Sequence, residues 1–434
     1  MKLYGRKSCG LKSDRLKIGG ASSPKITAKS RACRGERPYI CRGDSRIAPT
    51  VGGCGRFSMK IGGAIALGLS LIFATAKPIK ANPHRATPVG WILEATGNVP
   101  IKPRGARDYY RVSVGTPLPR GTIIFPTSTM SVKILCADRR TYWLVPSGVP
   151  SGVGNGCPPL GERPDATRNT GGICSSPQPA SLPYIISPRS TFLLSAKPIL
   201  RWNPVADATL YIVSVSKKSG EILWQTTATD TELAYNGELP LEPGVQYELT
   251  VEAKFGANAS GSGASSRSET LPPGNGRISG FVFEVLSEQK AAEVKDAIAL
   301  LQEQELTETA KNLALARVYS DSRYNLRAEA ISLLEAAISR GIETTASYYL
   351  LGDLYCQVGL TSFAEQHYLR GIEQGTTERD FAARAALHAR LGQLYYSSRE
   401  DEKARRHWQQ ALYGYIALQD MERVAQIERE LERF

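Results

Sequence analysis

The chain has 434 residues, of which 42% are hydrophobic and 22% charged, so it can form about two to four domains with sizeable cores. Its net charge is +13, but residues 1–58 contain 14 lysines and arginines against three acids, which leaves about +2 for the remainder. Nucleic-acid binding requires cations on a folded surface, usually with aromatic rings that stack bases. Because the excess charge lies in a Gly/Ser/Arg-rich leader without apolar periodicity, the sequence argues against nucleic acid as a partner.

The segment MKIGGAIALGLSLIFATAKPIKANP, which begins at Met59, has a short basic start and an apolar centre. Small residues follow at Ala74-Thr75-Ala76 and again at Ile79-Lys80-Ala81. This pattern predicts a secretory signal peptide over residues 59–81, cleaved after Ala76 or Ala81. The apolar run of roughly 16 residues is shorter than the ~20 that span a bilayer. We therefore expect no stable membrane span in the mature chain, with retention as an anchor or a buried helix as the alternatives.

Residues 1–58 read as a disordered basic leader, and their position before a signal peptide has two interpretations. Either translation starts at Met59 and residues 1–58 are not translated, or a Ser/Arg-rich transit peptide precedes the export signal. Both interpretations predict export of the remaining chain to the periplasm or cell envelope.

Export permits disulfide bonds. The loop GNGCPPLGERPDATRNTGGICSS could be closed by Cys157 and Cys174, which form the candidate disulfide, and Cys136 in an expected strand could equally pair with either. No CxxC motif or Cys/His cluster appears, so no metal site is expected.

Residues 89–147 show short apolar runs broken by glycine and proline, which predicts β structure. WILEATGNVPI alternates on both sides of Gly97-Asn98, and TMSVKILCADRRTYWLV predicts two strands around an Asp-Arg-Arg turn. Together with Arg104, Gly115 and Leu118, these residues resemble the FecR-type periplasmic β domain. Thr122 replaces the aspartate that the family usually has after the glycine equivalent to Gly121. The resemblance implies a compact, non-catalytic extracytoplasmic module.

Residues 148–187 are rich in Gly, Pro and Ser and predict a linker. Residues 188–287 are expected to form a second β domain, because KPILRWNPVADATLYIVSVSKK and YELTVEAKF alternate strictly. Tyr247, Leu249, Val251 and Ala253 would share one face of a strand that starts after a Pro243-Gly244 turn. Trp202, Pro204, Ala208 and Tyr211 resemble those of a fibronectin type III or immunoglobulin-like sandwich. A polar tract, GANASGSGASSRSETLPPGNG, would be an insertion before a last strand, ISGFVFEVL.

From residue 288 to residue 434 proline is absent and the hydrophobic period changes to 3.6, which predicts helices. A pattern recurs within this segment. The first full copy consists of Leu351-Gly352, Tyr355, Gly359, Ala364, Tyr368 and Gly371. The second consists of Leu391-Gly392, Tyr395, Arg399, Ala404, Trp408 and Ala411. A weaker earlier copy contains Leu315-Ala316, Tyr319, Ala330, Leu334 and Ala337. These positions resemble those of tetratricopeptide repeats, which implies stacked helix pairs.

Each residue type in the repeat has a packing role. Gly352 and Gly392 would let the two helices of a pair approach closely, with Tyr355 and Tyr395 filling the space between helices. The copies are spaced by 36 and then 40 residues rather than 34, and we expect the extra residues to lengthen the turn SDSRYNLRA and the exit EQGTTERDFAA. A helix SEQKAAEVKDAIALLQ would precede the repeats. A final helix, MERVAQIERELERF, would present Val424, Ile427, Leu431 and Phe434 as one stripe.

The sequence favours a protein that is not an enzyme and needs no cofactor. The four histidines form no i, i+4 pair and no Ser/His/Asp constellation, and the glycine clusters lack the Lys-Ser/Thr of a phosphate loop. His388 takes the place of Tyr348 in the preceding copy, so a packing role is expected. His367 and His407 precede aromatic packing positions and should be partly exposed.

The tetratricopeptide resemblance implies a groove lined by the first helix of each pair, which holds an extended peptide or a partner's helix. The equivalent positions in the first copy are Leu313, Arg317 and Asp321. The main candidate groove contacts are Arg317, Tyr349, Asp353, Gln357, Gln393 and Tyr396. Such residues could hydrogen-bond a peptide backbone and stack a side chain, but they lack a basic carboxylate clamp. Residues 288–434 hold 18 basic and 23 acidic residues, a net charge of −5, which disfavours a membrane or nucleic-acid surface.

The predicted fold is therefore multidomain, with two all-β modules followed by an all-α solenoid of about three repeats, and the order resembles that of cyanobacterial-type envelope proteins. The function expected from it is that of a secreted, non-catalytic envelope adaptor or scaffold that binds protein partners in the repeat groove. In the alternative, the β modules bind cell-wall glycan or peptidoglycan and the repeats serve for oligomerisation. An enzymatic role would require a turnover that a single His or Glu substitution abolishes.

Overall fold

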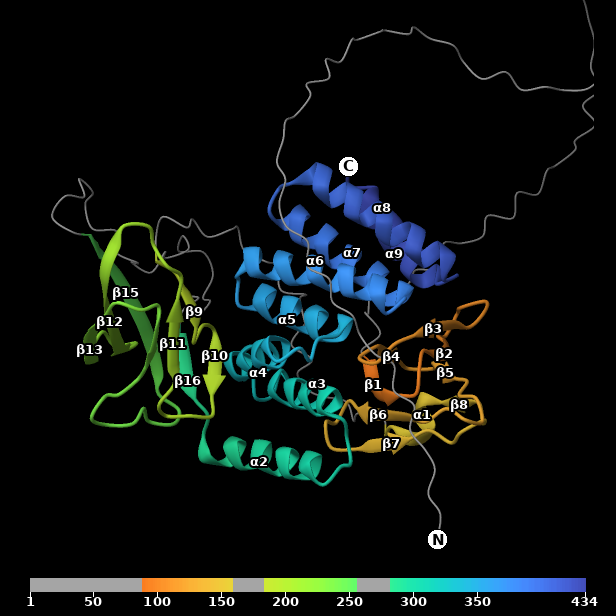
Figure 1. Ribbon diagram of the computed structural model, residues 1–434, viewed down its shortest axis with the longest axis horizontal. Helices are drawn as coiled ribbons and strands as arrows, with labels where there is room; N and C mark the ends of the chain where they lie inside the picture. Colours follow the sequence, from red (N-terminus) through yellow and green to blue (C-terminus); the bar gives the residue numbers. More distant parts are fainter. Residues whose placement is uncertain (1–87, 159–182, 256–281) are drawn as a thin grey trace, which may run out of the picture. The chain divides into compact units, whose positions relative to one another are not determined.

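The computed structural model describes residues 88–158, 183–255 and 282–434 (Figure 1). The leader, the predicted signal peptide and Cys174 lie outside the described residues. A β-rich region that begins at residue 88 is followed by a C-terminal helical region, as the sequence predicts. Within the described ranges, no helix combines the length and apolar character needed to cross a membrane.

The first β module, residues 88–158, consists of two four-stranded antiparallel sheets with the orders β4-β1-β6-β7 and β3-β2-β5-β8. Its elements are β1 Pro88–Ala95, β2 Val99–Lys102, β3 Tyr110–Val112, β4 Pro117–Pro119, β5 Ile123–Ile124, β6 Val132–Cys136, β7 Tyr142–Leu144, β8 Ser151–Gly152 and the short helix α1 Val153–Gly156. The expected turns are present, because Gly97 and Arg139 adopt φ of +104° and +63° between β1 and β2 and between β6 and β7. Alternating apolar residues from both sheets form the core, including Ile92, Ile101, Leu118, Ile124 and Ile134.

The first module extends into the segment predicted as a linker. β8 pairs with β5, and Val153 of α1 is fully buried in the module's core, so residues 148–157 are part of this module. The candidate disulfide between Cys157 and Cys174 is wrong, because Cys157 is bonded to Cys136 on β6, with Cα atoms 5.3 Å apart. The sequence left open whether Cys157 pairs with Cys174 or whether Cys136 pairs with one of the two. The fold selects the Cys136–Cys157 bond because the end of β6 lies beside α1. Closing a loop of this length stabilises the fold by about 3 kcal/mol.

The second β module, residues 183–285, contains a five-stranded sheet β10-β16-β15-β12-β13 and a three-stranded sheet β14-β11-β9. Its strands are β9 Ile185–Ser187, β10 Thr191–Leu193, β11 Ile199–Trp202, β12 Ala208–Lys217, β13 Ile222–Ala228, β14 Glu232–Ala234, β15 Gln246–Phe255 and β16 Val282–Val285. β9 also falls within the predicted linker. The module therefore begins before residue 188, and the polar tract predicted as an insertion lies outside the described residues.

The strict alternation in β15 has the predicted consequence. Tyr247, Leu249, Val251 and Ala253 are all buried, while the residues between them are partly exposed. They pack with Trp202 in a core separate from that of the first module. Gly244 adopts φ of +79° just before the strand, as the Pro243-Gly244 turn predicts.

Eight helices make up the described C-terminal region (Figure 1). They are α2 Glu288–Gln302, α3 Glu308–Tyr319, α4 Arg327–Ser339, α5 Thr345–Gln357, α6 Thr361–Thr377, α7 Phe381–Ser397, α8 Asp401–Ala417 and α9 Met421–Leu431. Each of these helices contacts the next, and α5 also contacts α7. Consecutive helices thus form stacked neighbours rather than isolated elements.

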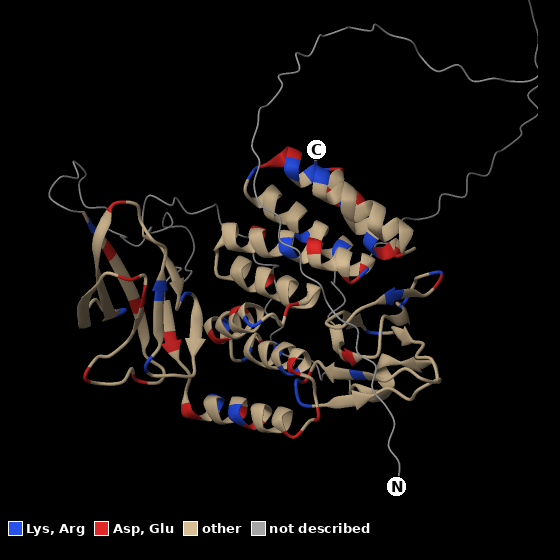
Figure 2. Ribbon diagram, viewed as in Figure 1, with Lys and Arg blue, Asp and Glu red and all other residues tan. Residues whose placement is uncertain are grey.

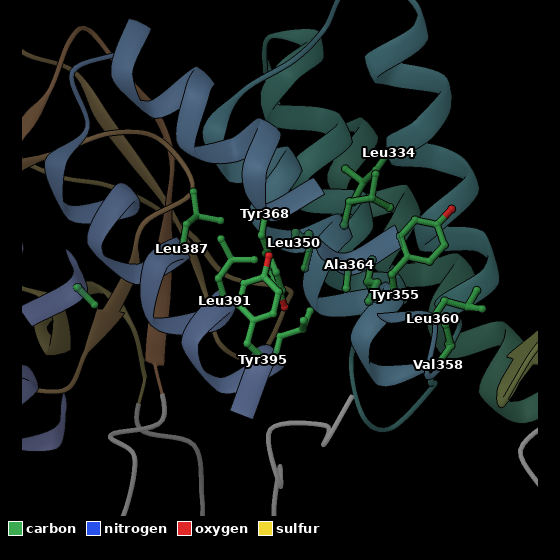
Figure 3. Close-up of a cluster of buried hydrophobic side chains, with 14 of the residues drawn as sticks. Leu334, Leu350, Tyr355, Val358, Leu360, Ala364, Tyr368, Leu387, Leu391 and Tyr395 are labelled. Carbon is green, nitrogen blue, oxygen red and sulfur yellow. The ribbon is translucent and has the colours of Figure 1, made fainter. Parts of the chain in front are cut away.

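The recurring sequence positions form one continuous core in the helical region (Figure 3). A Cβ atom on Gly352 would lie 2.5 Å from the Tyr368 ring, and one on Gly392 would lie 2.4 Å from the Trp408 ring. Tyr355, Tyr368 and Trp408 have exposures of 1% or less. The predicted role of the two glycines, close approach of the paired helices, is confirmed twice at equivalent positions.

The prediction about the extra residues of the longer repeat is only partly right. The turn between α3 and α4 contains the expected residues 320–326. The exit after residue 373 does not form a longer turn, because α6 continues to Thr377 and both α6 and α7 have 17 residues, against 13 in α5. No proline stops these helices, and Gly375 permits close contact with Arg384 of α7, so the additional residues continue as helix.

Candidate binding face on helices α5 and α7

Three polar side chains meet between two neighbouring first helices: Tyr349 and Asp353 on α5, and Arg390 on α7. Together with Gln393, which follows Arg390 on the same side of α7, we call them the α5–α7 face. Tyr349 and Asp353 are four residues apart and Arg390 and Gln393 three, so each pair lies on one side of its helix. All four residues are partly exposed, whereas Leu350, Leu351 and Leu391 beside them are buried in the core.

Arg390 organises this face through its guanidinium group. Its Nε donates a hydrogen bond of 2.9 Å to the Tyr349 hydroxyl, and an Nη donates one of 2.8 Å to an Asp353 carboxylate oxygen. The other Asp353 oxygen accepts from the Tyr368 hydroxyl at 2.7 Å. The Arg390 and Asp353 side chains remain 25% and 18% exposed, so this pair borders solvent.

Arg390 on this face and Arg317 on the neighbouring helix α3 differ in how far nearby groups compensate their charges. Burial acts to lower the pKa of Arg390, but the Asp353 carboxylate and the Tyr349 hydroxyl outweigh it and raise that pKa well above its ordinary value. Burial lowers the pKa of Arg317 on α3 to about 10, because the weaker effects of Tyr349 and Asp353 do not compensate for lost water. The two arginines therefore differ in that only Arg390 has a carboxylate partner.

The six sequence-predicted contacts do not form a single surface. Tyr349, Asp353 and Gln393 lie on the α5–α7 face. The Arg317 guanidinium lies 5.0 Å from the ring of Trp91 on β1, so the first β module contacts this residue, which remains partly exposed. The other first-copy positions are buried, since Leu313 packs with Leu93 of β1 and Asp321 is only 2% exposed.

Gln357 and Tyr396 lie elsewhere. Gln357, at the end of α5, is exposed and accepts a hydrogen bond of 3.1 Å from Arg327 of α4. The Tyr396 ring packs against Trp408 and the C-terminal Phe434, with centroid distances of 5.5 and 5.9 Å. Tyr396 therefore contributes to the packing of the last helices, through its contacts with Trp408 and Phe434.

Sequence reasoning missed Arg390, although a signal for it was present. Arg390 is 40 residues after Leu350, a core position in the preceding copy. An arginine at a repeat position that is otherwise apolar indicates either a local opening of the core or a charged partner. Here the partner is Asp353.

A second missed feature joins the first β module to the helices. Asp380 and Asp420, 40 residues apart, cap the N-termini of α7 and α9 by accepting from the Ala383 and Arg423 amides at 2.8 and 3.2 Å. Asp380 also accepts hydrogen bonds from the amide and hydroxyl of Ser113.

Close packing accompanies these bonds along the same junction. Asp420 accepts a hydrogen bond of 3.2 Å from the Tyr110 hydroxyl. At Gly115 a Cβ atom would lie 2.0 Å from that of Ala346 on α5, and the glycine's φ is +86°. The first module therefore contacts the N-terminal ends of α5, α7 and α9.

The second β module contacts α4 through partly buried polar groups. Arg201 forms an ion pair of 2.6 Å with Glu335, and the Leu194 amide donates to Glu329 at 2.7 Å. Burial raises the pKa of Glu329 to about 7, despite that hydrogen bond.

All three histidines of the helical region lie against other rings, and His367 and His407 are also partly exposed, as the sequence predicts. His367 stacks on Tyr355 with a centroid distance of 5.3 Å, and His407 contacts Tyr395 at the same distance. His388 and His407 face each other with their Nδ1 atoms 3.0 Å apart, so one nitrogen donates and the other accepts in the neutral pair. Within the described ranges, no cluster of three or more His, Cys, Asp or Glu side chains could hold a metal ion.

Acidification is expected to destabilise the fold through the His388–His407 pair. Burial, His407 and Arg384 lower the pKa of His388 to about 4 from its ordinary 6.5, so between these pH values the unfolded chain binds a proton that the folded chain does not. The contribution of His388 to the free energy of unfolding is therefore fully present above pH 6.5. It is lost as the pH drops toward 4, which lowers the free energy of unfolding by about 1–2 kcal/mol after allowance for the ring's partial exposure.

Urea unfolding from about pH 7.5 to about pH 4.5 measures this dependence. Glu329 contributes the opposite slope, because its folded pKa is raised, so the comparison is with His388→Gln, which retains Glu329. The variant should lose less stability on acidification than the original protein. If the free energy of unfolding fell equally with pH in both proteins, the effect could not be assigned to His388.

Charges over the helical region are mixed: Figure 2 shows acidic and basic residues interspersed along the helices.

Comparison with known proteins adds little to this description. No family model matches the chain, and no curated protein matches it. A solved structure, BtubC (BKLC) from P. vanneervenii, is 19% identical over 33% of this chain and 72% of that one, with a TM-score of 0.25. A likeness this small carries no argument about fold or function.

Proposed function

We propose that the chain is an exported, non-catalytic scaffold of the cell envelope, which binds an extended segment of a protein partner across the α5–α7 face. In this proposal the helices are tetratricopeptide repeats, the first module is FecR-like and the second is a fibronectin or immunoglobulin-like sandwich. The equivalent contacts of Gly352 with Tyr368 and Gly392 with Trp408 support repeat identity. The disulfide between Cys136 and Cys157 supports an oxidising compartment.

One observation carries the proposal: the first helices present polar side chains that are partly exposed. Tyr349 offers a ring and a hydroxyl, Asp353 and Arg390 form a solvent-bordering pair, and Gln393 offers an amide. A peptide backbone needs hydrogen-bond donors and acceptors, and its side chains need a ring or an aliphatic surface to contact. A structural core would have buried apolar residues at these positions, as it does at Leu350 and Leu391.

A peptide library displayed against the full chain tests this function, with affinities measured by fluorescence anisotropy of labelled hits. The double variant Tyr349→Ala/Gln393→Ala should weaken binding by about tenfold or more, because it removes a ring and an amide at the contact. The matched control is Gln409→Ala/Tyr413→Ala, which removes the same residue types from the exposed surface of α8. Equal loss in both variants would contradict a role for the α5–α7 face.

A second candidate function, glycan binding by the β modules, has one feature in its favour. An open hollow of about 300 Å³ lies in the second module and is lined by residues of β12, β13, β14 and the turn between β13 and β14. Its lining consists of Leu210, Thr227, Ala228, Thr229, Asp230, Glu232 and Leu233. Two carboxylates and two threonine hydroxyls could bind sugar hydroxyls. Retention of the full chain by purified cell-wall glycan, lost on Asp230→Ala and not on Tyr349→Ala, would favour this function over the first.

A further inference from the structure

Strand β13 of the second module lies at the end of the five-stranded sheet, and among the described residues it pairs with β12 alone (Figure 1). Its backbone groups on the outer side therefore have no partner strand in the described chain. After a bulge at Leu223, residues 224–228 pair with β12 in unbroken register. A regular edge of this kind can accept the backbone of a further strand.

The other edge strands of this module are covered or short. β10, at the opposite end of the same sheet, lies against the helical region, where the Phe192 amide and the Thr191 hydroxyl donate to the Asn325 carbonyl oxygen at 3.0 and 3.1 Å. β9 and β14, which end the smaller sheet, have three residues each. β13 has seven residues and contains no charged residue and no proline, the two residue types that most often keep an edge strand from pairing.

The exposed side chains of β13 are all neutral. Ile222 and Leu223 are 60% and 38% exposed, and Gln225 and Thr227 are exposed as well. Like charges that face each other across a strand pair are destabilising, and β13 offers none. Two copies of this strand can therefore lie antiparallel about Thr226, with Gln225 of each copy opposite Thr227 of the other.

The charges that flank β13 favour this direction of pairing. Lys218 lies in the turn before the strand and Asp230 in the turn after it, both are exposed, and neither forms an ion pair within residues 183–255. The other charged groups beside the two turns are paired within the chain, namely Lys217 with Glu221 and Arg201 with Glu232.

The direction of the second strand decides which of the unpaired charges meet. In an antiparallel pair of identical strands, the start of one strand lies beside the end of the other, so Lys218 of each copy faces the end that carries Asp230 of the other. A parallel pair would bring Lys218 beside Lys218 and Asp230 beside Asp230. The flanking charges therefore attract in the antiparallel arrangement and repel in the parallel one.

We propose that the chain forms a two-fold symmetric dimer in which the β13 strands of two copies pair antiparallel and join the two five-stranded sheets into one. The contact area of one strand edge is small, so the dimer is reversible and depends on protein concentration. This inference goes beyond the proposed function and does not depend on it, because β13 shares no residue with the α5–α7 face. Dimerisation gives the scaffold two copies of that face.

Sedimentation velocity of the full chain, over about a hundredfold range of concentration, measures the monomer–dimer equilibrium by mass action. Gln225→Lys/Thr227→Lys places like charges opposite each other in the dimer, as does Gln225→Glu/Thr227→Glu, and each should raise the dissociation constant about tenfold or more. An equal mixture of the two variants brings opposite charges together and should restore a mixed dimer. The matched control, Gln366→Lys/Thr377→Lys, adds the same charge at exposed positions of α6 and should leave the dissociation constant unchanged.

Amide hydrogen exchange provides a second readout that needs no variant, so it still decides if the charged strands fail to fold. In the original protein, exchange of residues 222–228 should slow as the concentration rises and the dimer forms. A chain that stays monomeric at every concentration would overturn the proposal. So would a dimer that both charged variants retain, or one whose formation slows exchange in other segments and not in β13.

Discussion

Replacement of Trp408 by alanine is expected to lower the free energy of unfolding by about 3–5 kcal/mol. Trp408 is 1% exposed, and its ring lies against Gly392 of α7 and is in contact with Tyr396 and Phe434. Truncation removes a large apolar surface and leaves a cavity between α7 and α8. The rigid stacking of the last helices prevents the site from closing completely, so the cavity cost adds to the transfer cost.

Urea unfolding followed by circular dichroism measures this effect, and α8 supplies a matched control. Tyr413→Ala removes an aromatic ring from the same helix, but Tyr413 is 64% exposed, so a change within about 0.5 kcal/mol is expected. Gly392→Ala tests the same contact from the other side: a methyl group 2.4 Å from the Trp408 ring should cost about 1–3 kcal/mol. Comparable stability of Trp408→Ala and Tyr413→Ala would show that the repeat core is not built as described.

The second large effect is expected at the junction between the first β module and the helices. Asp380→Ala should destabilise the chain by about 3 kcal/mol, because it removes the α7 N-cap and leaves the Ser113 donors without their acceptor. Asp380 is fully buried, so no water replaces the carboxylate.

Asp401→Ala, which removes an exposed carboxylate from the first turn of α8, is the control and should change stability by about 0.5 kcal/mol or less. Ser113→Ala should have an intermediate effect, because the cap of α7 survives while one donor is lost. The Ser113–Asp380 contact does not stabilise the junction if Ser113→Ala leaves the free energy of unfolding unchanged and Asp380→Ala lowers it by no more than the loss of a helix cap, about 1 kcal/mol.

The β strands and the helices could be predicted because their signals are local. Alternation in residues 247–253 requires only a strand with one buried face, and the spacing of Gly352, Tyr355 and Tyr368 requires only two helices in contact. The junction residues were not predicted, since Ser113 and Asp380 are 267 positions apart and neither carries a local signal for the other. The recurrence of aspartate at positions 380 and 420 was visible in the sequence, but its second role at the module boundary was not.

The candidate face shows the same division. Tyr349, Asp353 and Gln393 are assigned from repeat position alone, because helical periodicity fixes which side of the helix they occupy. Whether such a position is open depends on what the rest of the chain places over it. Trp91 lies against Arg317 and Phe434 lies against Tyr396, and neither contact follows from periodicity.

The sequence by itself determined that residues 89–147 and 188–287 contain strands and residues 288–434 contain helices, and which glycines permit close helix contact. The tertiary structure alone decided that Cys136 pairs with Cys157, that Arg390 joins Asp353, and that Arg317 lies beneath an indole ring without a carboxylate. The physical reason is range. Hydrophobic period and turn chemistry act over a few neighbouring residues, whereas disulfide partners, buried charges and covered surfaces depend on segments that only the fold brings together.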